Sequence, residues 1–331
     1  YSANKLIFKA AALIAMLTFG VKIISAAKDI VVAAKFGTSD VMDAFVIAYL
    51  LPTFFSSVIA SMLNAALIPT YIRTREQQGQ DAAQKLFSNI LSISILLLIV
   101  ATSLLALIGP ICLTLIAPSF NAEKQAITLH IFYILLPIIL ISGLSANLSA
   151  VLNAGERFAL AAITPVAMPF LSVSFLLLAQ ADWAIYGLSV GVVVGYATEM
   201  CLLSIALRRQ CVQIIPRWDG FDEQIRQVLK QCLPMLAGGI LMNSAAIVDQ
   251  SMASFLAPGS VSSLGYGSKL VTVIVAITIG ALGTAVLPYL SKMVSLSDWQ
   301  GIRHTLKTYI RIILLGTLPV TALLILFSNL I

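Results

Sequence analysis

The sequence predicts an all-α polytopic membrane protein. Of its 331 residues, 60% are hydrophobic and only 10% are charged, whereas about a quarter of the residues are charged in a soluble domain. Apolar runs of about 20 residues recur along the whole chain, and a helix of that length crosses the hydrocarbon core of a bilayer. The runs are continuous rather than alternating, which favours a helical bundle over a membrane β-barrel.

Nine membrane spans are expected, each an apolar run between clusters of charged or turn-forming residues. They lie near 6–34, 41–72, 86–117, 125–153, 157–180, 183–207, 231–257, 260–291 and 306–331. The chain starts at Tyr1 and ends inside the last apolar run, so we expect a fragment of a longer protein. The first run lacks the pattern of a signal peptide and is expected to be a mature span.

The longest polar stretch, residues 211–230, separates two groups of spans. It predicts an N-terminal lobe with helices 1 to 6 at 1–210, a cytoplasmic linker, and a partial C-terminal lobe with helices 7 to 9 at 231–331. A short amphipathic helix is expected in the linker, lying at the inner membrane surface with Trp218 and Phe221 as anchors.

A weak internal repeat also indicates two halves. Gly37 and Gly259 each precede a span, and LNAALIP (63–69) matches LGTAVLP (282–288) as L-x-x-A-h-h-P. Both spans run in the same direction, as in transporters whose halves are related by an axis along the membrane normal.

The orientation follows from the positions of lysine and arginine, which are in excess in cytoplasmic loops. With the amino terminus in the cytoplasm, only Lys35 and Lys124 fall outside. The net charge of +6 is then explained by topology and by contact with anionic membrane lipids. No nucleic-acid partner is needed to account for it.

Ionisable residues interrupt the first apolar run. Thr18, Lys22, Ser25 and Asp29 follow the spacing i, i+4, i+7, i+11, and Lys28 lies beside them. This spacing puts the four residues on one face of a helix. Because a charge at the bilayer centre costs about 2.5 to 3.5 kcal/mol on insertion scales, we expect this face to line water rather than lipid.

A similar polar stripe is predicted on the eighth span. It comprises Ser262, Tyr266, Lys269 and Thr272. A rise of about 1.5 Å per residue puts Lys269 near the middle of the membrane, at a depth comparable with that of Lys22.

These stripes predict a central cavity whose lysines bind an anionic substrate, with phosphate or pyrophosphate as the obvious anion. The second span adds an acid and a polar stripe to the same cavity. The candidate substrate-binding residues are Lys22, Lys28, Lys269, Asp29, Asp43, Ser57, Asn64 and Tyr266. In the alternative interpretation, Lys22 or Lys28 pairs with Asp29 or Asp43 only to hold helices together.

Three further polar residues lie in apolar spans. Asp249, Asn243 and Glu199 are candidates for an ion site, and Glu199 for a proton or cation site. Interhelical hydrogen bonding or packing explains them equally well, and a packing role is preferred for Glu199.

No motif of an enzyme or a cofactor site is recognised. A phosphate-binding glycine loop and a nucleophile elbow are both missing from the sequence, and cysteines and histidines have no metal-ligand spacing. The sequence therefore predicts neither a cofactor nor a metal. It predicts that the energy comes from an ion gradient or the membrane potential rather than from ATP.

Several stretches resemble the MviN/MurJ family of lipid II flippases, within the superfamily of multidrug and lipid-linked oligosaccharide exporters. They are AAKDIVVAAKFGTSDVMDAF (26–45), P-x(11)-N-A-A-L-I-P (52–69), ASFLAPGSVSSLGYGSKL (253–270) and ALGTAVLPYLSK (281–292). The resemblance implies a V-shaped, two-lobed bundle of fourteen helices, nine of them present here, in a bacterial inner (cytoplasmic) membrane. It implies alternating access that moves a polyprenyl-pyrophosphate-linked glycan to the outer leaflet.

The resemblance also implies roles for individual residues. Lys22 and Lys28 correspond to cavity arginines of the family, and Lys269 corresponds to its helix 8 arginine. Asp29 and Asp43 correspond to its acids. Lysine keeps the charge but gives up the bidentate phosphate binding of arginine.

Two positions depart from the family pattern. Ser56 and Ser57 stand where the family usually has arginine, and Thr272 stands near a position where it often has an acid. The cargo is therefore expected to be lipid II or a related precursor, such as an exopolysaccharide unit. The alternatives left open are a multidrug or ion antiporter of the same superfamily and a non-transporting membrane scaffold.

Overall fold

The computed structural model describes residues 2–155, 158–210, 212–218, 220, 223–272 and 299–326. Within these ranges the chain is helical with short turns and contains no strand, which confirms the all-α class. The chain divides into two compact units, residues 23–266 and a unit that combines 1–22 with 267–331. The division into two transport lobes stays a prediction.

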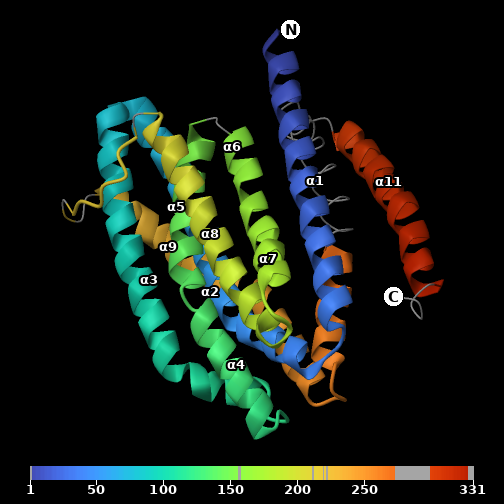
Figure 1. Cartoon of the computed structure of the whole chain (residues 1–331). Coiled ribbons are helices and arrows are strands. Elements are labelled where there is room, and N and C mark those ends of the chain that lie inside the picture. The colour runs from blue at the N-terminus through green and yellow to red at the C-terminus, as the bar shows by residue number, and fades with distance from the viewer. Residues whose placement is uncertain are drawn as a thin grey trace. The chain divides into compact units, whose positions relative to one another are not determined.

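The helices follow one another with few interruptions (Figure 1). In chain order they are α1 (Ser2–Phe36), α2 (Asp40–Gln78), α3 (Gln80–Ile116), α4 (Ala122–Leu135), α5 (Ile138–Ala154), α6 (Phe158–Ile163), α7 (Ala167–Leu178), α8 (Ala184–Arg208), α9 (Glu223–Ser254) and α11 (Trp299–Leu326). Short 3₁₀ turns lie at η1 (Thr164–Val166) and η2 (Ala181–Trp183), and residues 260–272 are also helical.

Six segments within the described residues are long and apolar enough to cross a membrane. They are Asp40–Gln78, Gln80–Ile116, Ala122–Ala154, Phe158–Leu178, Ala181–Arg208 and Lys230–Ser254. Each overlaps an expected span. The other three expected spans overlap α1, the helix at 260–272 and α11, and they stay predictions as membrane crossings. Residues 273–291 of the eighth expected span lie outside the described residues.

Proline divides two of the expected spans into shorter helices. The fourth span turns at Leu136 and Pro137 between α4 and α5, because a proline has no N–H to continue the helical hydrogen bonding. The fifth span is divided in the same way, with Pro165 in the 3₁₀ turn between α6 and α7.

The centre of the unit formed by 23–266 is α2, which packs against α3, α4, α5 and α9. Its apolar side chains, among them Met42, Ile47 and Leu67, belong to one buried core. The turn before α2 is set locally. Gly37 has φ of +54°, and the Ser39 hydroxyl accepts a hydrogen bond from the Met42 N–H at 3.4 Å, which caps the helix.

Helices α7 and α8 lie side by side in Figure 1 and pack closely. Glycines on α8 allow this approach. A Cβ atom on Gly191 would lie 2.8 Å from the Cα of Ser172, and one on Gly195 would lie 2.5 Å from the Cα of Met168. Small residues at such positions let two membrane helices come into backbone contact.

The linker differs from the expected short helix. Residues 212–218 belong to no helix, and the helix that follows starts at Glu223 and continues to Ser254 without a break. Gln84 of α3 holds this non-helical part, since its side chain donates to the Gln213 carbonyl at 2.6 Å and accepts from the Gln213 N–H at 3.1 Å. The first turns of α9 therefore occupy the place of the separate helix. Phe221 lies outside the described residues.

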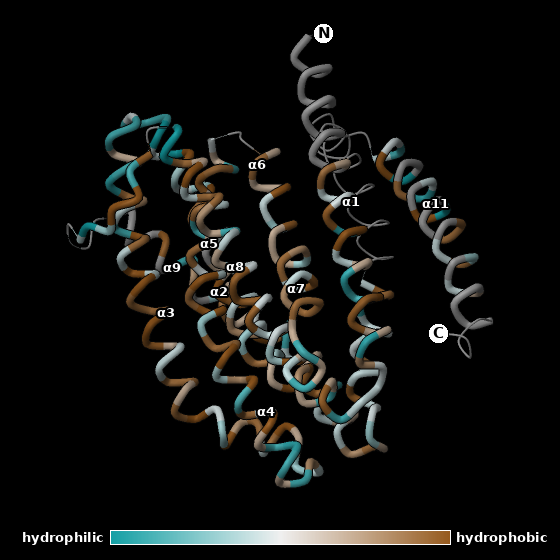
Figure 2. Tube along the Cα trace, in the orientation of Figure 1, coloured by the Kyte–Doolittle hydropathy of each residue, from teal (hydrophilic) through white to brown (hydrophobic). Residues whose placement is uncertain are grey.

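The colouring by hydropathy separates the ends of the helices from their middles (Figure 2). The turn between α2 and α3 and the first turn of α4 are hydrophilic, whereas the middle of α3 is hydrophobic. Exposed leucine and isoleucine side chains on α3 include Leu107, at 78% exposed, and Leu115, at 72%. An apolar face of this size on a membrane-length helix fits contact with lipid.

Candidate functional site

The first polar cluster is centred on Asp43, near the start of α2. Its carboxylate accepts hydrogen bonds from the N–H groups of Gly259 and Ser262, both at 2.8 Å. These N–H groups belong to the first turn of the helix at 260–272 and the turn before it, where a helix has unpaired donors and a partial positive charge. Asp43 therefore caps a helix more than 200 residues away in sequence.

Lys124 of α4 completes this cluster. Its ammonium group donates to Asp43 at 2.8 Å and to Asp40 at 2.6 Å, and it lies 4.2 Å from the centroid of the Phe120 ring. The Lys124 side chain is 9% exposed and that of Asp43 is 2% exposed. We call Asp40, Asp43, Lys124, Gly259 and Ser262 the Asp43 junction.

The backbone approaches closely at this junction. Gly259 has φ of +90°, and a Cβ atom there would lie 2.6 Å from the carbonyl oxygen of Thr38. Ser254 adds a further link by donating to the Ile116 carbonyl at 3.1 Å, and the Ser119 hydroxyl donates to the Ser254 carbonyl. The junction thus ties the start of α2 to α3, α4 and the end of α9.

The second polar cluster lies on α1. Lys28 and Asp29 form an ion pair at 2.7 Å, with side chains 14% and 21% exposed. Asp29 is near enough to Tyr49 of α2 and to Tyr266 to act electrostatically on both. The Tyr266 hydroxyl donates to the Gly37 carbonyl at 3.2 Å. These side chains come from three helices, α1, α2 and the helix at 260–272, so this cluster is a meeting point inside the unit.

The third polar cluster joins α2 to α8. The hydroxyls of Tyr49 and Tyr196 lie 3.2 Å apart, and either can be the donor. Glu199, one helical turn from Tyr196, acts on it electrostatically. The sequence prediction treated Glu199 as a packing or ion residue, and the structure places it at the end of this tyrosine pair.

The remaining predicted residues are distributed over both units. In the unit formed by 1–22 and 267–331, Lys22 is exposed and Lys269 is half-buried. Ser57 of α2 is exposed, and the Asn64 side chain lies outside the described residues.

On α9, the two candidate ion residues have different surroundings. The Asn243 side chain donates to the Gly239 carbonyl of its own helix at 2.8 Å, whereas Asp249 is exposed. Within the part of the chain that the structure describes, no group of three or more histidine, cysteine, aspartate or glutamate residues has the arrangement of a metal site.

Lys124 was not predicted as a functional residue, because the sequence places it at a helix start next to a loop. Such lysines are ordinarily solvated. The residues just before it, Asn121 and Glu123, mark the start of a helix, and Asn121 caps α4 by accepting from the Lys124 N–H at 2.8 Å.

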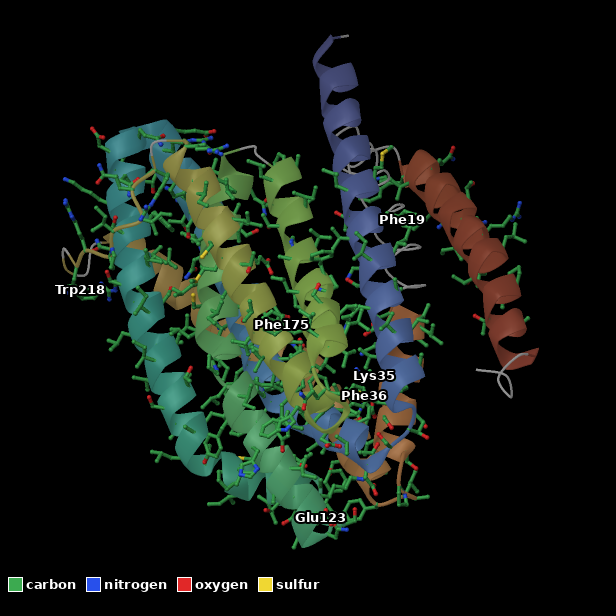
Figure 3. All side chains as sticks on the ribbon, viewed as in Figure 1. Phe19, Lys35, Phe36, Glu123, Phe175 and Trp218 are labelled. Atoms are coloured by element: carbon green, nitrogen blue, oxygen red, sulfur yellow. The ribbon has the colours of Figure 1, made fainter. Side chains whose placement is uncertain are left out.

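Figure 3 shows Glu123 at the tip of α4, far along the bundle from Trp218, which lies beside α3.

Another unpredicted contact holds the end of α1. Lys35 donates from its ammonium group to the Leu176 carbonyl of α7 at 2.8 Å, and Figure 3 shows it between the two helices. A cation is favourable at the C-terminal end of a helix, where carbonyls are unpaired.

Helices of membrane length that carry ion pairs and tyrosines inside the bundle define a polytopic protein with a polar interior, the arrangement of membrane transporters. The sequence profile of the lipid II flippase MurJ family matches residues 32–331. The chain therefore belongs to the MurJ family, as its motifs predicted.

Relatives in other bacteria support the same assignment. A probable lipid II flippase MurJ of Rhizobium tropici is 25% identical over 94% of this chain and 60% of its own length. The corresponding protein of Rickettsia prowazekii is 25% identical over 98% of this chain and 64% of its own length. The chain thus spans somewhat more than three fifths of the length of these relatives.

Solved structures share the fold. A lipid II flippase MurJ in an inward closed conformation superposes with a TM-score of 0.80 at 21% identity, over 96% of this chain and 66% of that one. An inward-facing multidrug resistance transporter of the MATE family gives 0.78 at 12% identity, over 96% and 74%. The fold is therefore common to flippases and multidrug transporters.

Proposed function

We propose that this chain acts in a flippase that moves a polyprenyl-pyrophosphate-linked saccharide, lipid II or a related cell-envelope precursor, from the inner to the outer leaflet. Membership of the MurJ family is the observation that carries this proposal. The polar clusters inside the bundle support it, because ionisable residues within membrane spans commonly mark a substrate path. The proposed setting is the bacterial inner membrane, with the amino terminus in the cytoplasm.

The proposed substrate contact is the pyrophosphate group. Lys28 has its ammonium group beside Asp29 at 2.7 Å in an incompletely buried pair, so an incoming anion competes with the carboxylate for it. A lysine binds phosphate as a point charge. Lys22 and Lys269 are proposed as further cationic contacts, with Ser57, Asn64 and Tyr266 as polar ones.

The Asp43 junction is proposed to close one end of the substrate path. Asp43 accepts from both N–H groups and from Lys124, and Asp40 accepts a second hydrogen bond from Lys124. Alternating access requires a contact of this kind that forms in one state and opens in the other. Asp43 then controls access rather than binding the substrate.

The protein is proposed to act as a transporter without catalytic chemistry. Its energy would come from the membrane potential or a coupling ion, with Asp249, Asn243 and Glu199 as candidate ion residues. Asp249 is the more accessible of the two on α9.

The fold similarity to multidrug transporters supports one alternative, an antiporter for cationic drugs. A pocket for cations would have unpaired carboxylates. Asp29 and Asp43 instead have cationic partners, which favours an anionic cargo. A scaffold without transport activity would retain no lipid cargo in the experiment below.

The test measures which lipid copurifies with the complete protein in native mass spectrometry. Lys28→Gln, and the pair Lys22→Gln with Lys269→Gln, are expected to lose a polyprenyl-pyrophosphate glycan that the wild type retains. Lys85→Gln is the matched control, since Lys85 is an exposed lysine of α3, and it is expected to retain the lipid. Bulk phospholipid alone in every sample would contradict the flippase and favour the scaffold or the antiporter.

A further inference from the structure

Four polar side chains from three helices are arranged around one hydroxyl contact inside the unit of residues 23–266. The Tyr49 and Tyr196 hydroxyls are 3.2 Å apart, and Glu199 follows Tyr196 by one turn of α8. Asp29 of α1 has a longer-range electrostatic influence on Tyr49. The substrate contacts proposed above explain only Asp29. The tyrosine pair and Glu199 have no role in them.

The series runs along the helices rather than across them. At a rise of about 1.5 Å per residue, Asp29 lies about 10 Å from the C-terminal end of α1, and Tyr49 about 14 Å from the start of α2. Tyr196 and Glu199 lie about 18 Å and about 22 Å from the start of α8. In the predicted topology these three helix ends lie at the outer surface of the membrane. Each residue of the series therefore lies deeper in the membrane, counted from that surface, than the one before.

Glu199 is the inner end of the series. It is half-buried in a 25-residue apolar helix, and within the described residues it takes part in no ion pair. A carboxylate in such a place is costly, and acids in membrane spans that lack a cation are typical of proton relays.

The surroundings of Glu199 contribute few other ionisable groups. Helices α5, α6 and α7, which pack on α8, have none in their described residues, and α2 contributes Tyr49. Helix α4 contributes His130, which lines an apolar groove with Tyr186 and Gly187, at least about 18 Å along α8 from Glu199. At the other end of α8, Arg208 lies about 14 Å away. Lys28, Tyr49 and Tyr266 are among the groups near Asp29.

We propose that Glu199 is a proton-binding site, connected to the Lys28–Asp29 pair by the hydroxyls of Tyr49 and Tyr196. A tyrosine hydroxyl both donates and accepts a hydrogen bond, so it passes a proton on and remains neutral. A proton leaves the carboxylic acid of Asp29, each tyrosine accepts one proton and gives up another, and the carboxylate of Glu199 receives the last.

The consequence concerns Lys28, and this part rests on the proposed function. When Asp29 holds the proton, it is neutral and no longer competes with an anion for the Lys28 ammonium group. When Glu199 holds the proton, Asp29 is charged and the ion pair forms again. The path therefore couples the position of one proton to the availability of the substrate contact.

The first experiment detects the proton site without a substrate. Infrared difference spectra of the complete protein in lipid bilayers, recorded between about pH 5 and about pH 9, are expected to show the C=O band of a protonated carboxylic acid that Glu199→Gln abolishes. Tyr196→Phe should shift this band, whereas the control Glu123→Gln, an exposed acid of α4, should leave it unchanged. A spectrum in which Glu199→Gln removes no titrating band would overturn the proposal.

The second experiment measures proton movement per translocated polyprenyl pyrophosphate in proteoliposomes that contain a pH-sensitive dye. The wild type is expected to move protons with the lipid, and Tyr49→Phe and Tyr196→Phe should slow the proton movement at least about tenfold. Tyr133→Phe is the matched control, because the Tyr133 hydroxyl only donates to the Ala106 carbonyl.

The two proposals fail in different ways. If the wild type moves no polyprenyl pyrophosphate, the proposed function is wrong, and the infrared band alone decides whether Glu199 binds a proton. If the lipid moves with the same proton ratio in the wild type and in Glu199→Gln, the function holds and the proton site is wrong.

Discussion

Two aspartates that the sequence assigned to one cavity have very different surroundings. Asp43 is buried and receives hydrogen bonds from Lys124 and from the N–H groups of Gly259 and Ser262. Asp29 is partly exposed, and its ion pair is with the residue next to it, Lys28. The first holds together segments that are far apart in sequence, whereas the ion pair of the second joins two neighbouring residues of one helix.

The difference separates a structural charge from an exchangeable one. A buried ion pair that loses one partner leaves an uncompensated charge, at a cost of about 3 to 5 kcal/mol. The Lys28–Asp29 pair joins neighbouring residues of one helix, with side chains 14% and 21% exposed, so breaking it separates no segments that are far apart in sequence. We therefore expect substitutions at the two aspartates to affect different properties.

The largest effect is expected at the centre of the Asp43 junction. Asp43→Ala leaves Lys124 with Asp40 alone and leaves two N–H groups without an acceptor, so the free energy of unfolding should fall by about 3 to 5 kcal/mol. Thermal unfolding of the purified protein in detergent measures it. Asp40→Ala is the control, since the Asp40 side chain is 59% exposed, and equal losses for the two variants would contradict the special position of Asp43.

The next effect tests the backbone of the same junction. Gly259→Ala puts a Cβ atom 2.6 Å from the Thr38 carbonyl at φ of +90°, so it combines backbone strain of about 1 to 3 kcal/mol with a clash. Gly79→Ala has the strain alone, because φ there is +91° and nothing lies within 4 Å of the added atom. The same unfolding measurement should show the greater loss for Gly259→Ala. A smaller loss than for Gly79→Ala would argue against close packing at the junction.

A smaller change in stability is expected on α1, together with a large change in transport. Lys28→Gln should lower the free energy of unfolding by less than Asp43→Ala does, because the Lys28–Asp29 pair joins adjacent residues of one helix, yet remove most lipid translocation in proteoliposomes. Lys28→Arg keeps the charge and should retain translocation. A strongly destabilised Lys28→Gln protein would mean that the pair with Asp29 is a structural link, like the Asp43 junction.

The smallest effect, and one of opposite sign, is expected where a polar group is buried without a partner. Asn147 of α5 is fully buried, and neither atom of its amide has a hydrogen-bond partner among the described residues. An unsatisfied buried group costs about 1 to 3 kcal/mol, so Asn147→Leu should leave stability unchanged or increase it. Ser172→Leu is the contrast, since the Ser172 hydroxyl donates to the Pro169 carbonyl at 3.0 Å. A marked loss for Asn147→Leu would indicate a partner for the amide.

The helical class and the position of most helices were predictable from the sequence because hydrophobicity alone decides them. Runs of apolar residues between charged clusters correspond to α2, α3, α8 and most of α9. The divisions at Pro137 and Pro165 were missed as boundaries because a proline within a membrane span either bends it or ends a helix, and composition does not distinguish the two.

The site was predictable as a set of residue types and not as a set of contacts. Periodicity placed Asp29 on the polar face of α1, and the pairing of Lys28 with Asp29, which the alternative interpretation included, is present in the structure. Asp43 was predicted to face the same cavity, but its partners Lys124 and Gly259 lie 81 and 216 residues away. Local sequence patterns cannot predict contacts between residues so far apart in the chain. Only the packing of α2, α4 and the segment after α9 shows which residues are the partners of Asp43.

The glycines of α8 give the molecule a fixed internal reference. Because Gly191 and Gly195 bring the backbones of α7 and α8 into contact, these helices have no room for a second packing arrangement. Two spin labels, placed on the exposed side chains of Leu178 and Val190, should therefore report one distance throughout a transport cycle. A second pair of spin labels, placed on other helices, would then report motion if its distance changed while the distance between α7 and α8 stayed constant.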